Sequence, residues 1–291
     1  MMIDTFIKQH HLPASFKISA QEHFISLAEQ IFSLATQEKK TLFIGVNGCQ
    51  GSGKSTLTAF ITHYLTKQYS LAVVNLSLDD FYLSRNQRQT LAKSIHPLLV
   101  TRGVPGTHNI ELLSKTLANL KAGNPTLLPR FNKSTDDIEP KNNWIDSPDV
   151  VDVVLLEGWC WGVSAQKGHD LTEPINELEQ YKDATNHWRN YVNQQLANQY
   201  QPLYQYMDKW LMLQAPSFEC VFNWRWQQEE LLASSLKSKN NRVMSEAEIY
   251  DFIQYFQRIT EHALTTFGQH ADLVFKLNLQ REIYQSIGKF I

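Results

Sequence analysis

The sequence predicts an α/β fold, a three-layer sandwich in which helices flank a five-stranded parallel sheet. Two observations predict it. Short apolar runs alternate with helical or long polar segments, which implies right-handed crossovers between parallel strands. The first run also leads directly into a glycine-rich loop and then a helix. The expected strands are 42–47, 72–78, 151–157, 209–214 and 272–277.

The segment before the first strand is predicted to be helical. Ser19 and Glu22 have the spacing of a capping box, with the hydroxyl three residues before the carboxylate. The apolar residues that follow recur at helical spacing, which indicates one buried face. They are Phe24, Leu27, Ala28, Ile31 and Leu34. We therefore expect an N-terminal helical segment over residues 1–40.

The loop after the first strand matches the pattern G-x-x-x-x-G-K-[ST] at every fixed position. Its flanking strand and helix provide the context that this phosphate-binding loop requires, which disfavours a chance match. Its glycines let backbone N–H groups turn onto phosphate oxygens, and the following helix adds its dipole. The candidate ATP-binding residues are Gly48, Cys49, Gln50, Gly51, Ser52, Gly53, Lys54, Ser55 and Thr56. The sequence thus predicts a P-loop NTPase fold.

Carboxylates follow the second and third expected strands. Asp79 and Asp80 come directly after the second strand, where a kinase needs a carboxylate beside the acceptor hydroxyl. The alternative is that this pair caps the next helix. Glu157 ends the third apolar run, as a Walker-B acid does. We expect Lys54 to contact the β- and γ-phosphates, and Ser55, Glu157 and Asp79 to surround Mg²⁺.

Two long connections interrupt the alternation, at residues 79–150 and 160–207. Both begin at the carboxyl end of a strand, where ligands of open α/β sheets bind, so both are expected to form the acceptor site. Arg102, Arg130 and Lys133 suit an anionic acceptor. The alternative for each of these three residues is a solvated surface cation. For His108, nearby, a structural role competes with a functional one.

Residues 223–245 are rich in basic side chains and follow the fourth strand. A basic helical segment there is where a lid would close over phosphates, and closure would exclude water. The candidate lid residues are Arg225, Lys239 and Arg242. The alternative is an ordinary exposed helix. Ser245 then opens a second capping box with Glu248, ahead of a helix that is expected to cover the sheet.

Composition excludes several classes of protein. The 291 residues carry a formal net charge of −2, so nothing indicates a nucleic-acid partner. The three cysteines form no C-x-x-C pair, which argues against a disulfide framework or a cysteine zinc site. No stretch approaches the roughly 20 apolar residues of a membrane span. We expect a soluble, cytoplasmic protein that acts on a small molecule.

Several motifs in this order resemble the D-glycerate kinase-like branch of the P-loop kinases, which groups with phosphoribulokinase, uridine kinase and pantothenate kinase. They are SLDDFY, RGVPGTH, PRFNK, VVLLEGW, NELE and QAPSFE, after the P-loop. The resemblance covers the chain from about residue 40 to 278. It implies the strand order 2-3-1-4-5 and a helical lid. It also implies that Asp79 is the catalytic carboxylate and that Glu157 is the Walker-B acid.

The same resemblance implies the acceptor site. Arg102 and the turn containing Thr107 and His108 fall where relatives bind the acceptor, and Tyr82 belongs to the SLDDFY motif. Asn109 and Asn132 stand where many relatives carry Asp, so the charge of those side chains is lost here.

The predicted function is ATP-dependent phosphoryl transfer to a hydroxyl group of a small metabolite, within a single domain over residues 1–291. The preferred acceptor is D-glycerate, which would give 3-phosphoglycerate. The alternatives are another small acceptor, such as a nucleoside or a pantothenate-like compound, and a P-loop ATPase or regulatory switch that transfers phosphate only to water.

Overall fold

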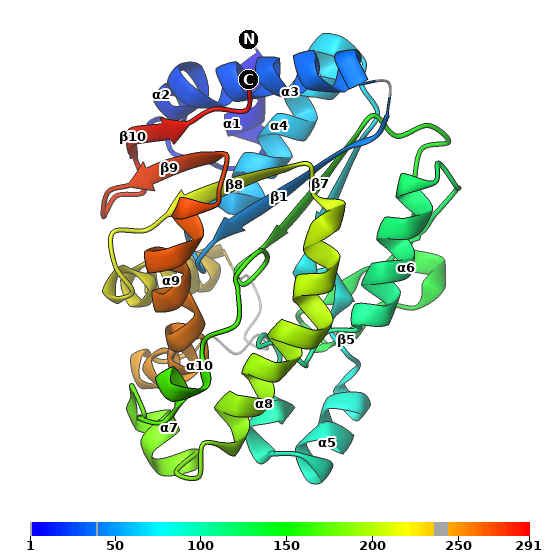
Figure 1. The fold of residues 1–291 in the computed structure, drawn as a ribbon. Helices are drawn as coiled ribbons and strands as arrows, with labels where there is room; N and C mark the ends of the chain where they lie inside the picture. The colour runs from blue at the N-terminus through cyan, green and yellow to red at the C-terminus, as the bar shows by residue number, and fades with distance from the viewer. Residues whose placement is uncertain (1, 39, 236–243) are drawn as a thin grey trace.

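The computed structural model describes residues 2–38, 40–235 and 244–291, and within them a central sheet of six strands. Their order across the sheet is β10-β9-β8-β1-β7-β2 (Figure 1). The strands are β1 (Leu42–Gly48), β2 (Val73–Ser77), β7 (Val153–Gly158), β8 (Lys209–Gln214), β9 (Leu273–Leu277) and β10 (Ile283–Gly288).

The five predicted strands are confirmed, and they run parallel in the predicted order 2-3-1-4-5. The predicted count of five strands is wrong, because β10 pairs antiparallel with β9 as a sixth strand. β10 has no apolar run, since five of its six residues are exposed. The tight turn over residues 278–282 and the antiparallel ladder hold it in the sheet instead.

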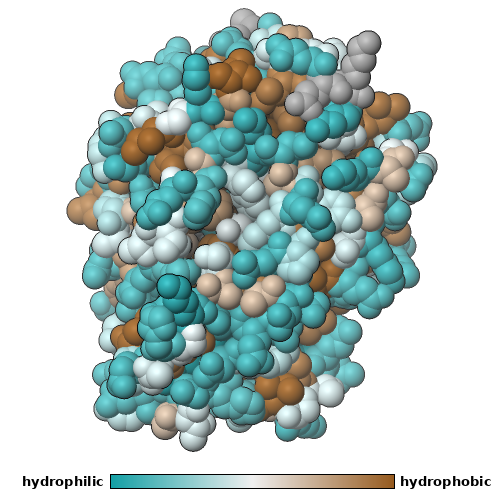
Figure 2. Space-filling view, viewed as in Figure 1, coloured by the Kyte–Doolittle hydropathy of each residue, from teal (hydrophilic) through white to brown (hydrophobic). Residues whose placement is uncertain are grey.

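The sheet is buried on both faces because successive side chains of a strand point to opposite sides. Leu42, Ile44 and Val46 of β1 join the cluster under α1 (Met2–Gln9), α3 (Ile25–Glu38) and α4 (Lys54–Tyr69). Phe43 joins the opposite cluster. Each such fully buried side chain contributes about 1.5–3 kcal/mol. Hydrophilic residues cover most of the face seen in Figure 2.

The cluster that contains Phe43 lies beneath helices that cover the other face of the sheet. These include α6 (Ile110–Lys121), α8 (His187–Gln195) and α10 (Glu246–Thr266), which Figure 1 shows on the side away from α1, α3 and α4. The predicted capping box at Ser245 is confirmed, since both of its hydrogen bonds with Glu248 are present.

The predicted capping box at Ser19 is wrong. Ser19 is the last residue of α2 (Phe16–Ser19), which continues through a π-helical turn (Ala20–Phe24) into α3. Ser19 already has helical torsion angles, φ −57° and ψ −39°, and its side chain makes no capping bond. A side chain inside a continuous helix cannot reach the next turn's free N–H groups as an N-cap does. The described residues before β1 include the helices α1, α2 and α3.

The first long connection is made of short elements. They are η2 (Leu78–Phe81), α5 (Arg85–Ser94), η3 (Pro97–Val100), α6, β3 (Leu127–Leu128), β4 (Phe131–Asn132), β5 (Asp137–Ile138), η4 (Lys141–Asn143) and β6 (Ile145–Asp146). β3 pairs with β6, and β4 pairs with β5, both antiparallel. The β4–β5 hairpin lies against η2 at the end of β2, so this connection reaches the carboxyl edge of the sheet.

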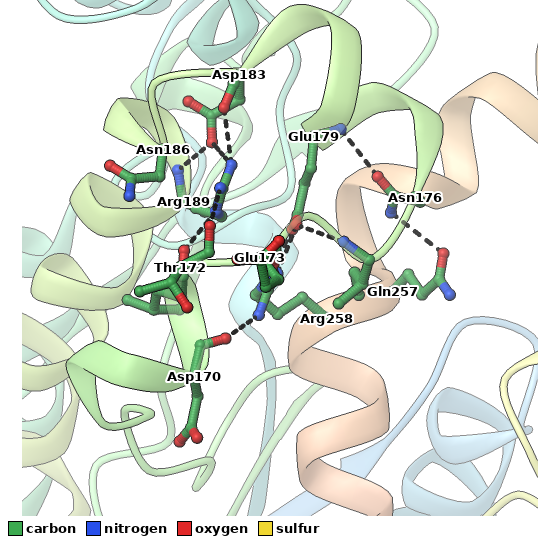
Figure 3. Close-up of polar contacts among 12 residues, drawn as sticks. Asp170, Thr172, Glu173, Asn176, Glu179, Asp183, Asn186, Arg189, Gln257 and Arg258 are labelled. Atoms are coloured by element: carbon green, nitrogen blue, oxygen red, sulfur yellow. Dashed lines mark hydrogen bonds and ion pairs between the residues drawn. The ribbon is translucent and has the colours of Figure 1, made fainter.

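The second long connection contains two buried ion pairs, one of which anchors it to α10 (Figure 3). Its elements are η5 (Gly168–Leu171), α7 (Glu177–Lys182), α8, η6 (Leu196–Tyr200) and η7 (Gln201–Tyr206), and α9 (Glu219–Ser235) follows β8. Arg258 of α10 donates to both carboxylate oxygens of Glu179, at 2.7 and 2.6 Å. Arg189 pairs with Asp183 at 2.9 Å. Buried charges persist when they are paired and hydrogen-bonded in this way, so the connection has a fixed position on α10.

Candidate active site

The predicted P-loop joins β1 to α4. Cys49, Gln50, Gly51, Ser52 and Gly53 form the turn, and Lys54, Ser55 and Thr56 begin α4. Gly51 and Gly53 have φ of 78° and 93°, which favours glycine. A Cβ on Gly51 would also lie 2.7 Å from Cβ of Trp224 on α9. The first N–H groups of α4 have no intrahelical partner, and such a helix terminus is suited to phosphate.

Side chains from the P-loop and β7 meet at the base of this turn. Ser55 Oγ donates to Glu157 Oε1 at 2.7 Å, and Lys54 Nζ lies 3.6 Å from Glu157 Oε2. Burial lowers the pKa of Lys54, but Glu157 and Asp79 outweigh it, so this pKa is raised. Lys54 therefore carries a positive charge where phosphate would bind.

Glu157 is a candidate metal ligand. It is buried, and its Oε2 atom has no hydrogen-bond partner in the structure. A carboxylate oxygen beside a serine hydroxyl offers the hard oxygen ligands that Mg²⁺ takes. The described residues contain no group of three His, Cys, Asp or Glu side chains able to hold a metal. A metal here would thus take its other ligands from phosphate and water, as Mg²⁺ does in phosphate sites.

Ser77 connects Glu157 to the backbone of Asp79. Its hydroxyl donates to Glu157 Oε1 at 3.0 Å and accepts from the backbone N–H of Asp79 at 3.3 Å. Ser77 is opposite Glu157 in the parallel pairing of β2 and β7. The sequence reasoning missed Ser77, although its position at the carboxyl end of a strand was available. Ser77 caps η2, the short helix that contains Asp79 and Asp80. The alternative that the two aspartates serve as a helix cap is therefore wrong.

Asp79 and Asp80 face different partners. Asp79 accepts from Tyr82 Oη at 2.7 Å and from Lys133 Nζ at 2.6 Å. Burial raises the pKa of Asp79, but Lys133 and Lys54 outweigh it and hold this pKa well below its usual range. Asp80 accepts from Arg130 at 2.9 Å, yet burial raises its pKa. Asp79 is therefore ionised, and its charge contributes to the raised pKa of Lys54.

The three predicted acceptor-binding cations lie on neighbouring loops. Arg130 and Lys133 belong to the β4–β5 hairpin and contact the Asp pair described above. Arg102 lies over the ring of Phe131 on the same hairpin, with 5.6 Å from its guanidinium carbon to the ring centroid. Arg102 also pairs with Asp136. Each cation therefore has an acidic partner here, and an anionic acceptor would compete for it.

The turn that carries Thr107 and His108 lies beside the SLDDFY segment. Tyr82 and His108 form an isolated antiparallel bridge, and their rings stack with centroids 4.6 Å apart. Thr107 is fully buried, and its hydroxyl donates to Val104 O at 2.7 Å and accepts from Gly103 N–H at 3.0 Å. Thr107 thus holds the turn, while Tyr82 and His108 lie next to Asp79.

The two asparagines that replace aspartate have local structural roles. Asn109 caps α6 by accepting from Leu112 N–H at 3.0 Å. Asn132 accepts from Ser134 N–H at 2.9 Å and thereby shapes the β4–β5 turn. Both bonds use the side-chain oxygen that Asn and Asp share. Asn132 also donates from Nδ2 to Glu139 Oε1 at 2.7 Å, a bond that an ionised Asp could not make.

Of the three predicted lid residues, the structure describes Arg225. Arg225 lies on α9, where it pairs with Glu229 and lies 5.8 Å from the ring centroid of Phe252 on α10. Lys239 and Arg242 lie outside the described residues. The sequence reasoning missed Arg281, in the β9–β10 turn, whose guanidinium donates to Gly51 O at 3.5 Å. Nothing in the sequence marked this residue, because the turn approaches the P-loop only through β9 and β10.

Comparisons with known proteins agree with this geometry. The model of the phosphoribulokinase / uridine kinase family matches residues 43–178. The chain is 31% identical to the uncharacterized kinase mug58 of Schizosaccharomyces pombe, over 75% of this chain and 79% of that protein. It is 28% identical to the chloroplastic D-glycerate 3-kinase of Arabidopsis thaliana, over 83% of this chain but only 53% of that protein.

A solved structure shows the same fold. D-glycerate 3-kinase from Cryptococcus neoformans superposes with a TM-score of 0.77 at 27% identity, covering 91% of this chain and 99% of that one. Among the described residues, no helix is both long and apolar enough to cross a membrane. The matched family, the similarity to kinases over most of the chain and the P-loop with Glu157 beside Ser55 and Lys54 lead to one conclusion: this chain is a kinase of the phosphoribulokinase/uridine kinase family.

Proposed function

We propose that this protein transfers the terminal phosphoryl group of ATP, in the presence of Mg²⁺, to a hydroxyl group of a small anionic metabolite. D-Glycerate is the preferred acceptor, with 3-phosphoglycerate as the product. The observation that carries the proposal is the place of Asp79. Its ionised carboxylate lies at the end of β2, close enough to Lys54 for each to shift the other's pKa.

Candidate residues for each part of phosphoryl transfer are present among the described residues. Amides of the P-loop and Lys54 would bind the phosphates. Ser55 and Glu157 would hold Mg²⁺, which neutralises charge on the transferred group when bound. Asp79 would accept the hydrogen bond of the attacking hydroxyl and orient it in line with the phosphate. Because the pKa of Asp79 is low, its carboxylate stays ionised over the neutral range.

Two observations support a carboxylate-bearing acceptor. Arg102 and Arg130 lie beside the Asp79 segment, and a guanidinium binds carboxylates through two parallel hydrogen bonds. Two proteins similar to this chain are named D-glycerate 3-kinases. A pantothenate-like compound, which also carries a carboxylate, is one alternative acceptor. A nucleoside, which carries none, is the other.

The experiment is an acceptor screen with Mg·ATP and D-glycerate, uridine and pantothenate, with the product identified by mass. We expect phosphoryl transfer to D-glycerate and acceptor-dependent release of ADP. Phosphorylation of uridine or pantothenate instead would replace the acceptor. Release of ADP at the same rate without any acceptor would favour the ATPase alternative and contradict the kinase assignment proposed here.

We also propose that the enzyme works in the cytoplasm without a nucleic-acid or membrane partner. Cys49, Cys160 and Cys220 are unpaired and buried, as expected in a reducing compartment. The net charge of −2 gives no overall attraction to polyanions. Fractionation of cells that express the tagged protein would test the compartment.

A further inference from the structure

His108 lies buried beside the proposed acceptor site, at 4% exposure. Its Nδ1 atom is 2.6 Å from the hydroxyl of Tyr200, the last residue of η6. Its Nε2 atom is buried and has no hydrogen-bond partner. One ring nitrogen is therefore tightly partnered, and the other is directed at nothing that the protein provides.

The hydrogen bonds of Tyr200 decide which nitrogen of His108 carries the hydrogen. The backbone N–H of Gly106 donates to Tyr200 Oη at 3.2 Å, so the tyrosine oxygen already accepts one bond. Burial raises the pKa of Tyr200 well above its usual value, so the phenol keeps its hydrogen. That hydrogen finds an acceptor in His108 Nδ1. With the opposite tautomer, both the phenol hydrogen and the Nε2 lone pair would lack partners.

The imidazole is neutral in this environment. Burial lowers the pKa of His108 to about 4, although the charge of Asp79 opposes this shift. A neutral ring with an unprotonated Nδ1 carries its one hydrogen on Nε2. His108 thus presents a buried N–H donor, and buried donors are normally satisfied.

The unsatisfied donor lies close to the reacting end of the site. The His108 ring stacks on Tyr82, and Tyr82 Oη bonds Asp79 Oδ1 at 2.7 Å. Two backbone hydrogen bonds hold the segments of Tyr82 and His108 together. Leu83 N–H donates to Thr107 O, and Asn109 N–H donates to Phe81 O. A single stacked residue, Tyr82, thus connects the His108 ring to Asp79.

We propose that Tyr200 is a positioning residue that holds His108 as the tautomer with its hydrogen on Nε2, and that this N–H donates to an oxygen of the acceptor. The inference rests on the proposed kinase function and adds a requirement to it. The acceptor must present a lone pair at this point, as a carboxylate, carbonyl or hydroxyl oxygen does. Because the donor is neutral, it selects by hydrogen bonding rather than by charge, in contrast to Arg102.

The tautomer is measured first, by two-bond ¹⁵N–¹H correlation spectra of the whole protein with labelled histidine and no acceptor. The His108 signal is assigned by its loss in His108→Gln. We expect an unprotonated Nδ1 and a protonated Nε2, and a mixture of tautomers in Tyr200→Phe. A hydrogen on Nδ1 in the wild-type protein would overturn the proposal.

Steady-state kinetics provide the second readout, with the acceptor that the enzyme is found to phosphorylate as the substrate. Tyr200→Phe is expected to raise KM for the acceptor about tenfold, with KM for ATP unchanged. Tyr204→Phe is the matched control, since Tyr204 lies on η7 and its hydroxyl donates to Val163 O at 2.9 Å. Equal effects of the two substitutions, or a change in KM for ATP alone, would mean that Tyr200 is only structural.

Substitutions of His108 separate the two nitrogens. The amide nitrogen of Gln lies near the Nε2 position, whereas that of Asn lies near Nδ1. His108→Gln is therefore expected to bind the acceptor better than His108→Asn. In the His108→Gln background, Tyr200→Phe should raise KM less than in the wild type, because the amide donor needs no tautomer. Equal effects of Tyr200→Phe in both backgrounds would contradict the coupling.

Failure of the inference and failure of the proposed function are distinguishable. If D-glycerate and the other acceptors are not phosphorylated, the kinase proposal fails together with the assignment of the Nε2–H partner, whatever the tautomer. If an acceptor is phosphorylated but the tautomer or the KM effect is not as expected, only the role of Tyr200 and His108 fails.

Discussion

Lys133 Nζ lies 2.6 Å from Asp79 Oδ2, so the turn of the β4–β5 hairpin places a cation on the carboxylate that the sequence marked as catalytic. The bond joins residues 54 positions apart in the chain. It helps to hold the pKa of Asp79 below its usual range, after burial has acted in the opposite direction. The connection over residues 79–150 thereby favours the ionised form of the carboxylate that we propose to be catalytic.

Lys133→Met is expected to raise the pKa of Asp79, because a cation that favours the ionised form is removed. As the pH is lowered, Asp79 would then become protonated sooner. The acid limb of the pH–rate profile is therefore expected to shift to higher pH. KM for the acceptor should rise by at most about fivefold, since an exposed ion pair contributes up to about 1 kcal/mol. Lys141→Met, in the same insertion, should leave the acid limb in place.

Asp79→Asn should reduce turnover at least about a hundredfold while leaving ATP binding intact, because the amide cannot take a proton or orient the hydroxyl as a carboxylate does. Asp80→Asn is the comparison. Asp80 holds Arg130 and the backbone of Phe131, so its loss should raise KM for the acceptor more than it lowers kcat. Near-normal turnover in Asp79→Asn would remove this residue from the mechanism.

Glu157→Gln should raise the Mg²⁺ concentration that gives half-maximal activity by about tenfold or more, since it weakens an expected metal ligand. A Mg²⁺ titration of turnover at saturating ATP measures it. Asp152→Asn, at the opposite end of β7, should not change the Mg²⁺ requirement, because Asp152 accepts from Ala72 N–H at 2.7 Å and lies away from the P-loop. An unchanged requirement in Glu157→Gln would place the metal elsewhere.

His108 should make the protein less stable as the pH falls. Its pKa is about 4 when folded and near 6.5 when unfolded, so the unfolded chain takes up the proton first. The contribution of neutral His108 to the free energy of unfolding is fully present above about pH 6.5. It falls by about 3 kcal/mol as the pH decreases to 4. Urea unfolding at several pH values should show a shallower decline for His108→Gln. A decline of equal size in the wild-type protein and in His108→Gln would contradict this prediction.

Gly51→Ala should lower the melting temperature and weaken ATP binding more than Gly123→Ala does. Both glycines have positive φ, 78° and 70°, so both substitutions carry a backbone strain of about 1–2 kcal/mol. Only at Gly51 would the new Cβ collide with Trp224, at 2.7 Å, whereas nothing lies within 4 Å at Gly123. Equal effects of the two substitutions would show that the P-loop tolerates a shift of α9.

The sequence alone determined the parts of this protein that depend on local pattern. The P-loop residues, the five parallel strands and Glu157 follow from spacing and apolar runs, because turn geometry and strand burial are set by neighbouring residues. The order of the strands followed from the resemblance to a known branch of kinases. The edge strand β10 was missed, since its mostly exposed side chains leave no pattern, and it joins the sheet by backbone pairing with β9.

Only the tertiary structure decided which polar residues act on one another. Ser77 meets Glu157 because β2 and β7 are neighbours in the sheet, and Lys133 meets Asp79 because the β4–β5 hairpin returns to the sheet edge. Tyr200 reaches His108 across 92 positions of the chain, from a segment whose sequence reads as a polar helix. Hydrogen bonds depend on distance and direction in space, and a pattern along the chain carries neither.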